Sequence, residues 1–506
     1  MVMATSVLLG ACTQETKKTD EAAPLIKRTE VKSENGVLTP EVLYSMARVS
    51  DAQVSPDGSK VLYGVTFISV EQNKGNRELF VVNADGSDKK QITETPQSEQ
   101  NAVWIKGGKE IAFLSSESGS SQIWVMNADG SNRRQLSKLE NGINAFAFSP
   151  DESKVLYIQD IKFGQRTVDL YADLPKATGR VVDDLLYKHW DEWVETVPHP
   201  FVASVTESGL TDMADIMEGE PFECPMKPNS GIEDLAWSPD GKLIAYASRK
   251  KTGKAYALST NSDIYIYDLA SKNTRNLTEG MMGYDIMPQF SPDGKSIAWV
   301  SQERDGYESD KKRLFVANLE TGEKQDLTQS FDYNADAIQW LPDGKSLYMI
   351  ACKEAVTHIW QVGVADKQIR QITNGQYDYV SMHSVGNTMA AIRQSQINPS
   401  EVFAVNTQTG EAAEISFENK AILDQLNMPK SESRWIKTTD NKQMLTWVVY
   451  PPHFDPAKKY PAILYCQGGP QSTVSQFWSY RWNLAIMASQ GYIVVAPNRR
   501  GLPGFG

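Results

Sequence analysis

Apolar and polar positions alternate in short blocks along most of the chain, and one polar block recurs. The tetrapeptide Ser-Pro-Asp-Gly stands intact at 55–58, 238–241 and 291–294. Copies with one change lie at 149–152 and 341–344, and degenerate copies at 105–108 and around 384–387. Ser suits the first position of a type I turn, Pro presets φ at the second, and Gly closes the turn. Because apolar segments flank each copy, each one predicts a β-hairpin.

A second hairpin follows each of these turns, as in the strands expected over 122–126 and 134–136. Two hairpins per unit, at a period of roughly 40–50 residues, are typical of the four-stranded blade of a β-propeller. Seven units fit between Asp51 and Ser416, so we predict a seven-bladed β-propeller over 38–420. An insertion over 160–200 interrupts the third unit.

The pattern changes at both ends of this array. A short helix from Pro40 to Ala47 is expected before it, with Thr39 as N-cap. After Lys430 the blocks become those of an α/β fold. Strands are expected over 444–450, 461–466 and 492–497, and a helix over 481–489. A strand, a helix and a second apolar strand in that order imply a parallel sheet. The fold class expected is therefore an all-β seven-bladed propeller, followed over 430–506 by the beginning of an α/β domain.

Composition narrows the classes of function. The 506 residues carry a formal net charge of −12, and no Lys/Arg cluster stands out, which argues against a nucleic-acid partner. No apolar run is long enough to span a bilayer. Cys224, Cys352 and Cys466 are widely spaced, so we interpret them as buried thiols rather than a disulfide framework or a metal site. No cofactor and no metal are expected.

The N-terminus carries a targeting signal. Residues 7–12, Val-Leu-Leu-Gly-Ala-Cys, are typical of the end of a bacterial lipoprotein signal segment over 1–12, with Cys12 as the lipidated residue. The polar, Lys/Glu/Thr-rich residues 13–37 predict a flexible tether. The location expected is the bacterial cell envelope, and the membrane is reached only through that lipid anchor. The basic region of a signal peptide is missing, so a chance apolar start on a cytoplasmic enzyme stays open.

Several segments outside the repeats resemble one family. They are Tyr-Pro-Ala-Ile-Leu-Tyr-Cys-Gln-Gly-Gly-Pro at 460–470, Gly-Tyr-Ile-Val-Val-Ala-Pro-Asn-Arg-Arg-Gly at 491–501, Gly-Phe-Gly at 504–506, Pro-Pro-His-Phe-Asp-Pro at 451–456 and Val-Ser-Asp-Ala-Gln-Val-Ser-Pro-Asp-Gly at 49–58. From Leu38 onward the chain resembles the prolyl oligopeptidase family of serine peptidases, in the branch of dipeptidyl-peptidase 5 and the acylaminoacyl peptidases.

The resemblance implies an α/β-hydrolase domain capped by a propeller that limits access to small peptides. The nucleophile of such a fold sits on a Gly-x-Ser-x-Gly elbow, followed by Asp and then His. The sequence contains no such elbow, so it is expected to be an N-terminal fragment whose catalytic triad lies beyond Gly506. None of the five histidines, which would precede that nucleophile, is a candidate catalytic base.

One part of the active site is expected within the chain. In α/β-hydrolases the loop after the third strand supplies half of the oxyanion hole, and here that loop contains Gln467 and Gly468. A backbone N–H or the Gln467 amide aimed at the developing oxyanion would stabilise it. The alternative is a tight turn that only lets the chain leave the strand.

The insertion offers carboxylates for a peptide's amino end. Dipeptidyl peptidases of the family hold the free α-amino group with propeller carboxylates, and Asp191, Glu192 and Glu195 are available. Trp190 and Trp193 could wall such a pocket. The alternative is a short amphipathic helix with both Trp side chains packed on the blade. Arg500 fills a family position, although an arginine after an apolar strand is usually in a structural ion pair.

Three functions follow from these features. The first is a serine exopeptidase of the dipeptidyl-peptidase type acting on oligopeptides. The others are a propeller scaffold protein of the envelope, and an acylaminoacyl peptidase or esterase. A homodimer is left open.

Overall fold

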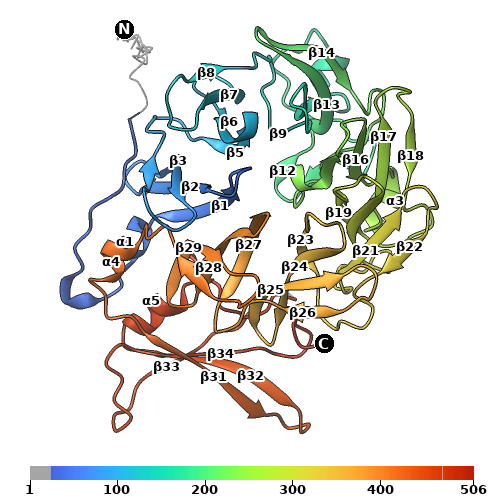
Figure 1. The fold of residues 1–506 in the computed structure, drawn as a ribbon. Coiled ribbons are helices and arrows are strands. Elements are labelled where there is room, and N and C mark those ends of the chain that lie inside the picture. The colour runs from blue at the N-terminus through green and yellow to red at the C-terminus, as the bar shows by residue number, and fades with distance from the viewer. Residues whose placement is uncertain (1–23, 470) are drawn as a thin grey trace, which may run out of the picture.

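The computed structural model describes residues 24–469 and 471–506 as a ring of antiparallel sheets with a smaller sheet beside it (Figure 1). The ring consists of five four-stranded sheets and one eight-stranded sheet, in which a single parallel pair, Thr357 with Asp378, joins the last two blades of four strands each. The seven-bladed propeller is therefore confirmed. The signal segment, Cys12 and the first part of the tether lie outside the described residues. No helix of the described residues is long and apolar enough to cross a membrane.

The strands of each blade follow one another along the chain and pair antiparallel. Blades 1 to 3 are β1 (Arg48–Val54), β2 (Lys60–Ser69), β3 (Lys74–Asn83), β4 (Lys90–Gln91); β5 (Gln100–Ile105), β6 (Glu110–Ser115), β7 (Gln122–Asn127), β8 (Arg134–Gln135); and β9 (Ala145–Phe148), β10 (Lys154–Lys162), β13 (Thr196–Thr206), β14 (Gly209–Asp215). Blades 4 and 5 are β15 (Leu235–Trp237), β16 (Leu243–Ser248), β17 (Asp263–Asp268), β18 (Thr274–Asn276); and β19 (Asp285–Phe290), β20 (Ser296–Ser301), β21 (Arg313–Asn318), β22 (Lys324–Asp326). Blades 6 and 7 are β23 (Asp336–Trp340), β24 (Ser346–Lys353), β25 (Val356–Gly363), β26 (Ile369–Gln371); and β27 (Asp378–Val385), β28 (Thr388–Ser395), β29 (Asn398–Val405), β30 (Ala412–Glu414).

The repeated tetrapeptide forms the turn between the first two strands of its blade, as predicted. In blade 1 the Ser55 hydroxyl donates to Asp57 at 2.5 Å and accepts from the Lys60 N–H at 2.9 Å. The Gly58 N–H donates to the Ser55 carbonyl at 2.8 Å, and Gly58 has φ +75°, which glycine adopts without a Cβ clash. The Ser55 bond, followed by bonds from Ser59, lowers the pKa of Asp57 to about 2, so the carboxylate accepts in its charged form.

A second repeated contact closes six blades of the described propeller. A buried hydroxyl just after the fourth strand accepts the N–H of a third-strand residue 14 positions earlier. The pairs are Leu79–Thr93, Ile123–Ser137, Ile264–Thr278, Leu314–Thr328, Ile359–Thr373 and Val402–Ser416, at 2.8–3.0 Å. An apolar residue precedes each hydroxyl, so the side chains there alternate between packing and hydrogen bonding.

The core of the ring lies between neighbouring blades. One cluster joins Val49 and Tyr63 of blade 1 to Ile392 and Val402 of blade 7. Comparable clusters join the other neighbours. Because every blade is apolar on both faces, its strands have near-continuous buried runs rather than a strict alternation.

The tether prediction is wrong for the part of residues 24–37 that the structure describes. Ile26 is 8% exposed and belongs to the cluster between blades 1 and 7. The Arg28 guanidinium forms an ion pair with the fully buried carboxylate of Glu418, which also accepts from Tyr63 and Lys89. The segment therefore joins the first and last blades, because it carries an apolar and a cationic side chain that match that junction.

The remaining helices are short. They are the α-helices α1 (Pro40–Ser45), α2 (Thr167–Leu170), α3 (Gly253–Leu258), α4 (Lys420–Leu423) and α5 (Leu484–Ser489), and the 3₁₀ turns η1 (Glu34–Gly36), η2 (Lys106–Gly108) and η3 (Ile232–Asp234). Helix α1 is confirmed, with the Thr39 side chain accepting the Val42 N–H.

The C-terminal sheet has the strand order β31 (Lys430–Lys437), β32 (Gln443–Tyr450), β34 (Ile493–Pro497), β33 (Ala462–Leu464). β33 and β34 are parallel and α5 connects them, as predicted, whereas β31 and β32 are antiparallel to their neighbours. The helix is shorter than expected, because Asn483 caps it by accepting the Ile486 N–H. Strand β31 was not predicted, because most of its side chains are exposed and polar.

This sheet lies beside blades 6 and 7 (Figure 1), and the segment around α5 packs on α1 through Trp478 and Ala485. The Ser475 hydroxyl donates to Asp378 of blade 7 at 2.6 Å, and the Gln396 amide donates to the Ser475 carbonyl at 2.7 Å. The Glu354 N–H of blade 6 donates to the Gly504 carbonyl at 2.7 Å. Apolar packing accompanies these bonds, since one cluster joins Ala355 to Trp447 and Val474, and another joins α1 to Trp478 and Ala485.

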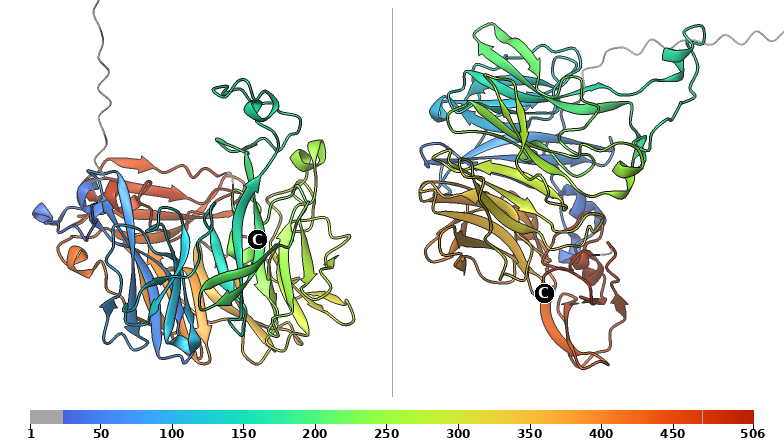
Figure 2. Two further views of the ribbon diagram at one scale, coloured as in Figure 1. Left: turned by 90° about the horizontal axis from the view of Figure 1, so that it is seen from above. Right: turned by 90° about the vertical axis from the view of Figure 1, so that its right-hand side faces the viewer.

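The insertion of blade 3 covers residues 163–195, since β10 and β13 stay paired as far as Lys162 and Thr196. It contains α2 and a hairpin of β11 (Lys188–His189) and β12 (Glu192–Trp193). Figure 2 shows it rising from the face of the ring on which the C-terminal sheet also lies, with α3 close by. The alternative of an amphipathic helix packed on the blade is wrong, because Trp190 sits in the hairpin turn at φ +56° and is 87% exposed.

Candidate functional site

The loop expected to supply the oxyanion hole follows β33 directly. β33 is held by β34, and the Tyr465 N–H still donates to the Val495 carbonyl at 2.8 Å before the chain leaves the sheet. Gln467 is half-buried and Gly468 is exposed. Gly469 has φ +133°, and a Cβ there would lie 2.9 Å from the Ser472 nitrogen, so this position requires glycine.

The packing of the protein does not require glycine at position 468. A Cβ placed on it would meet no atom within 4 Å. Within the described residues its N–H has no hydrogen-bond acceptor. The loop therefore offers an unused donor beside open space, which suits an approaching carbonyl oxygen.

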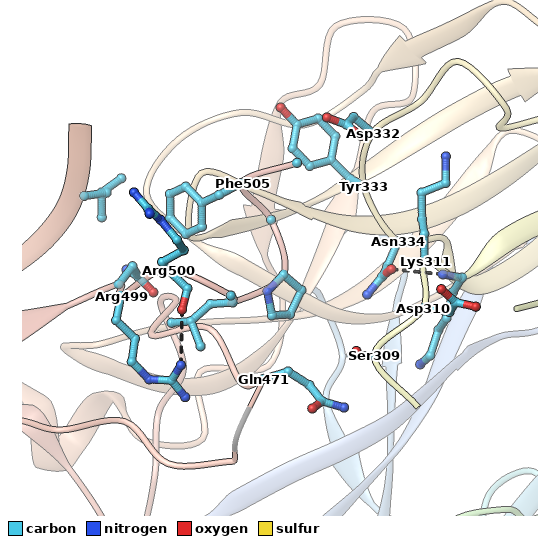
Figure 3. Close-up of a pocket in the computed structure, with 18 of the residues that line it drawn as sticks. Ser309, Asp310, Lys311, Asp332, Tyr333, Asn334, Gln471, Arg499, Arg500 and Phe505 are labelled. Atoms are coloured by element: carbon cyan, nitrogen blue, oxygen red, sulfur yellow. Dashed lines mark hydrogen bonds between the residues drawn. The ribbon is translucent and has the colours of Figure 1, made fainter. Parts of the chain in front are cut away.

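A cavity of about 920 Å³ lies between the propeller and the C-terminal segment. Figure 3 shows its two walls. One has Asp310 and Lys311 from a loop of blade 5 and Asn334 from the segment between blades 5 and 6, and the other has Arg499, Phe505 and Gln471 from the C-terminal part. Gln471 belongs to the loop that begins at Gln467, so the cavity reaches the candidate oxyanion loop. A concave site where two domains meet is a usual place for a ligand.

The charges around this cavity are largely paired. Arg500 forms an ion pair with Asp440 in the turn between β31 and β32, which agrees with the structural interpretation of that arginine. The Thr438 hydroxyl and then Arg500 lower the pKa of Asp440 to about 2. Arg304 is paired with Asp310, and Lys312 with Asp336 at 2.9 Å. The Arg499 guanidinium donates to the Arg500 carbonyl at 3.2 Å.

The three carboxylates predicted on the insertion have different environments. Glu195 accepts from Arg180 at 2.9 Å and 3.1 Å, and that guanidinium lies 4.4 Å from the centre of the Trp193 ring. The Glu195 carboxylate therefore stabilises the insertion itself through its ion pair with Arg180. Asp191 lies in the exposed hairpin turn.

Glu192 is the carboxylate whose direction is fixed by strand pairing. It pairs with His189 across the hairpin, and directly opposed residues project from the same face. Lys188 and Trp193 project from the other face, where the ammonium lies 4.8 Å from the ring centre. Glu192 is exposed, and within the described residues it has no ion-pair or hydrogen-bond partner.

Sequence reasoning missed Glu223, the residue that holds His189. Its carboxylate is 2% exposed, lies 2.8 Å from His189 Nε2 and accepts from the Tyr256 hydroxyl at 2.9 Å. The partners are 34 and 33 positions away, and no local pattern marks this glutamate.

The histidines inside the blades have structural contacts: His199 is fully buried and lies 2.8 Å from the Asp215 carboxylate, His358 is buried, and His383 is half-buried. Burial lowers the pKa of both His358 and His383 to about 4, so the rings are neutral near pH 7. His383 accepts the Val54 N–H at 3.0 Å, and His358 contacts the Thr373 hydroxyl at 3.1 Å. Both have structural roles between or within blades. Among the described residues no group of His, Cys, Asp and Glu side chains is arranged to hold a metal ion.

Comparison with known proteins agrees with this architecture. Residues 42–176 match the family model of the TolB beta propeller domain. Dipeptidyl-peptidase 5 of Porphyromonas gingivalis is 61% identical over 469 residues, which are 93% of this chain and 69% of that protein. Dipeptidyl-peptidase 5 of Porphyromonas endodontalis is 50% identical over 478 residues, which are 94% of this chain and 69% of that protein.

Solved structures show the same fold at low identity. An acylaminoacyl peptidase in complex with Z-Gly-Gly-Phe-chloromethyl ketone superposes with a TM-score of 0.73 at 18% identity, over 92% of this chain and 68% of that one. A puromycin-hydrolyzing peptidase of Mycobacterium tuberculosis has a TM-score of 0.68 at 13% identity, over 96% of this chain and 70% of that one.

The ring, the adjoining mixed sheet and the dipeptidyl-peptidase 5 relatives together define a class, the propeller-carrying peptidases. Within that class, the chain belongs to the prolyl oligopeptidase family of serine peptidases, in the branch of dipeptidyl-peptidase 5.

Proposed function

We propose that the protein is a serine exopeptidase that removes dipeptides from the free amino end of oligopeptides, with Glu192 holding the α-ammonium group. One observation carries this proposal. Glu192 is a carboxylate without a partner among the residues that the structure describes, and the insertion that carries it rises from the propeller face on which the C-terminal sheet lies (Figure 2).

The physical argument is the difference between a free and a blocked amino end. An ammonium group that leaves water needs a carboxylate, and a charge-assisted hydrogen bond between them is about twice as strong as a neutral one. An acylated amino end has no charge to offer and leaves the carboxylate without its partner. A carboxylate fixed at one distance from the reacting carbonyl therefore selects the length of the released fragment.

The alternatives within the insertion are weaker candidates for this role. Glu195 would have to leave Arg180, and Arg180 would have to leave the Trp193 ring. Asp191 lies in the turn and has no contact within the described residues that would fix its direction. Glu192 shares a hairpin face with an anchored residue, His189.

The test compares two substrates in the full-length enzyme, a dipeptidyl reporter amide with a free amino end and its N-acetylated form. The proposal expects kcat/KM for the free form to exceed that for the blocked form by about 100-fold or more. Equal values would assign the protein to the acylaminoacyl-peptidase or endopeptidase type instead.

A further inference from the structure

Glu223 connects two excursions of the propeller that are separate in sequence. The first is the insertion of 163–195, and the second is the segment with α3 between β16 and β17. His189 belongs to the first and Tyr256 to the second, and both contact the Glu223 carboxylate. A second link runs nearby, since the Gly253 N–H donates to the Asp184 carboxylate at 2.7 Å. The two excursions therefore form one unit on the propeller face.

The backbone around Glu223 is fixed to two blades. The Glu223 carbonyl accepts from the Ser248 hydroxyl of blade 4 at 3.0 Å. The next residue, Cys224, donates its N–H to the Pro198 carbonyl of blade 3 at 2.9 Å. The backbone that carries the Glu223 carboxylate is therefore fixed to two blades. His189 and Tyr256 are held in place by their contacts with that carboxylate.

The hairpin has few other contacts that could order it. Each of its strands is two residues long, and Trp190 is almost fully exposed at its turn. A hairpin of that size is not stable by itself in water. Its position therefore depends on the contact between His189 and Glu223, and on the stacking of Trp193 with Arg180 and Lys188.

Because His189 and Glu192 pair across the hairpin, fixing His189 also fixes the backbone position of Glu192. The two residues are directly opposed and project from one face of the hairpin. Glu223 is 2% exposed and each of its carboxylate oxygens already has a partner, whereas Glu192 is exposed, so Glu192 is the more accessible of the two for an ammonium group.

From these contacts we propose that Glu223 is a positioning residue, which fixes Glu192 for the amino end of the substrate by holding His189 and Tyr256. The inference rests on the proposed function, since it assigns Glu192 to the substrate ammonium. Loss of the Glu223 charge leaves the fold of the blades intact but frees the hairpin, so substrate binding changes more than the chemical step.

The experiment uses Glu223→Gln and His189→Gln in the full-length enzyme, with Glu220→Gln as the matched control. Glu220 lies on the same segment and pairs with Lys250 at 2.5 Å, but does not touch the hairpin. Amide hydrogen exchange is followed over residues 185–195, and kcat and KM are measured with a free-amine dipeptidyl reporter.

We expect exchange in the hairpin to accelerate by about tenfold in both test variants, because local opening then needs less free energy. KM should rise by about tenfold while kcat changes by less than about threefold. Glu220→Gln should change neither. Unchanged exchange, or a KM within about twofold of the parent in both variants, would overturn the positioning role.

A wrong proposed function would give a result that differs from a wrong positioning role. If the parent enzyme cleaves N-acetylated reporters as well as free ones, Glu192 does not hold an ammonium group. The positioning role then falls even where hairpin exchange accelerates in Glu223→Gln.

Discussion

At the scale of single residues, the donors of the oxyanion loop decide how the chemical step is stabilised. Gln467 is half-buried and could donate its amide, whereas Gly468 offers a backbone N–H beside open space. If the side chain donates, Gln467→Ala in the full-length enzyme should lower kcat by about 10²–10³ with little change in KM. If kcat stays within a few-fold of the parent, the side-chain role is wrong and the Gly468 N–H remains as the donor.

Asp378 makes the contact between the propeller and the C-terminal sheet dependent on pH. Burial raises its pKa from 3.8 to about 6, against the bonds from Ser475 and Thr357, which lower it. The folded state therefore binds the proton more tightly than the unfolded state does. This stabilisation is complete below about pH 4 and is lost as the pH rises through about 6.

Asp378→Asn tests this dependence. Asn keeps an acceptor for the Thr357 N–H and can donate to the Ser475 hydroxyl, but it does not titrate. Between about pH 4 and pH 7 the parent should lose on the order of 2 kcal/mol more stability than the variant. The difference between thermal midpoints at the two pH values measures it, and equal shifts in both proteins would contradict the assignment to Asp378.

Residues whose role is local could be predicted from the sequence, and those with distant partners could not. Thr39 caps α1, and the glycine of the repeated turn has positive φ, because both roles depend only on the next few residues. Glu223 depends on His189 and Tyr256, which the fold brings together from over 30 positions away. No local pattern contains that information.

At the scale of elements, the hydroxyl contacts that close six blades are a repeat as regular as the turns. The hydroxyl of Thr278 is fully buried, accepts the Ile264 N–H at 3.0 Å and donates to Asp263 at 3.0 Å. Sequence reasoning passed over this repeat because one Thr or Ser after an apolar residue is common in any chain.

Removing one of these hydroxyls should destabilise its blade. Thr278→Val keeps the shape of the side chain but leaves the Ile264 N–H buried without an acceptor, at a cost of about 1–3 kcal/mol. Thr196→Val, at an exposed position of β13, is the control and should change stability by less than about 0.5 kcal/mol. Chemical denaturation of both variants measures the difference, and equal effects would show that the hydroxyl contact adds nothing.

The hairpin shows where an element could not be predicted. Trp190 and Trp193 are three positions apart, which suits one face of a helix. In the structure one lies in a turn and the other in a strand, and both are exposed. The segment is ordered by Arg180 and Glu223, so its own periodicity says little about its conformation.

At the scale of the whole molecule, the seven blades and the parallel strands of the second sheet follow from the sequence, since each blade repeats the same local signals. How the two parts meet could not be predicted, because apolar clusters and single polar bonds, such as those of Ser475 and Gly504, join segments that are far apart in the sequence.

The edge of the second sheet leads to a prediction on solubility. β33 is an edge strand, and its Leu464 is 62% exposed. An apolar strand edge promotes association between copies. We expect residues 1–506 to associate or aggregate and residues 24–420, which keep the segment that joins the first and last blades, to behave better. Sedimentation velocity compares the two, and a monodisperse, stable 1–506 chain would contradict this expectation.

The central claim is that a carboxylate on the propeller arm recognises the free amino end of the substrate. The most direct test is the ratio of kcat/KM for free and N-acetylated dipeptidyl reporters, measured in the full-length parent, in Glu192→Gln and in Asp191→Asn. The account predicts a ratio of about 100 or more in the parent and in Asp191→Asn, and a ratio within about threefold of unity in Glu192→Gln. A ratio that stays high in Glu192→Gln would contradict it.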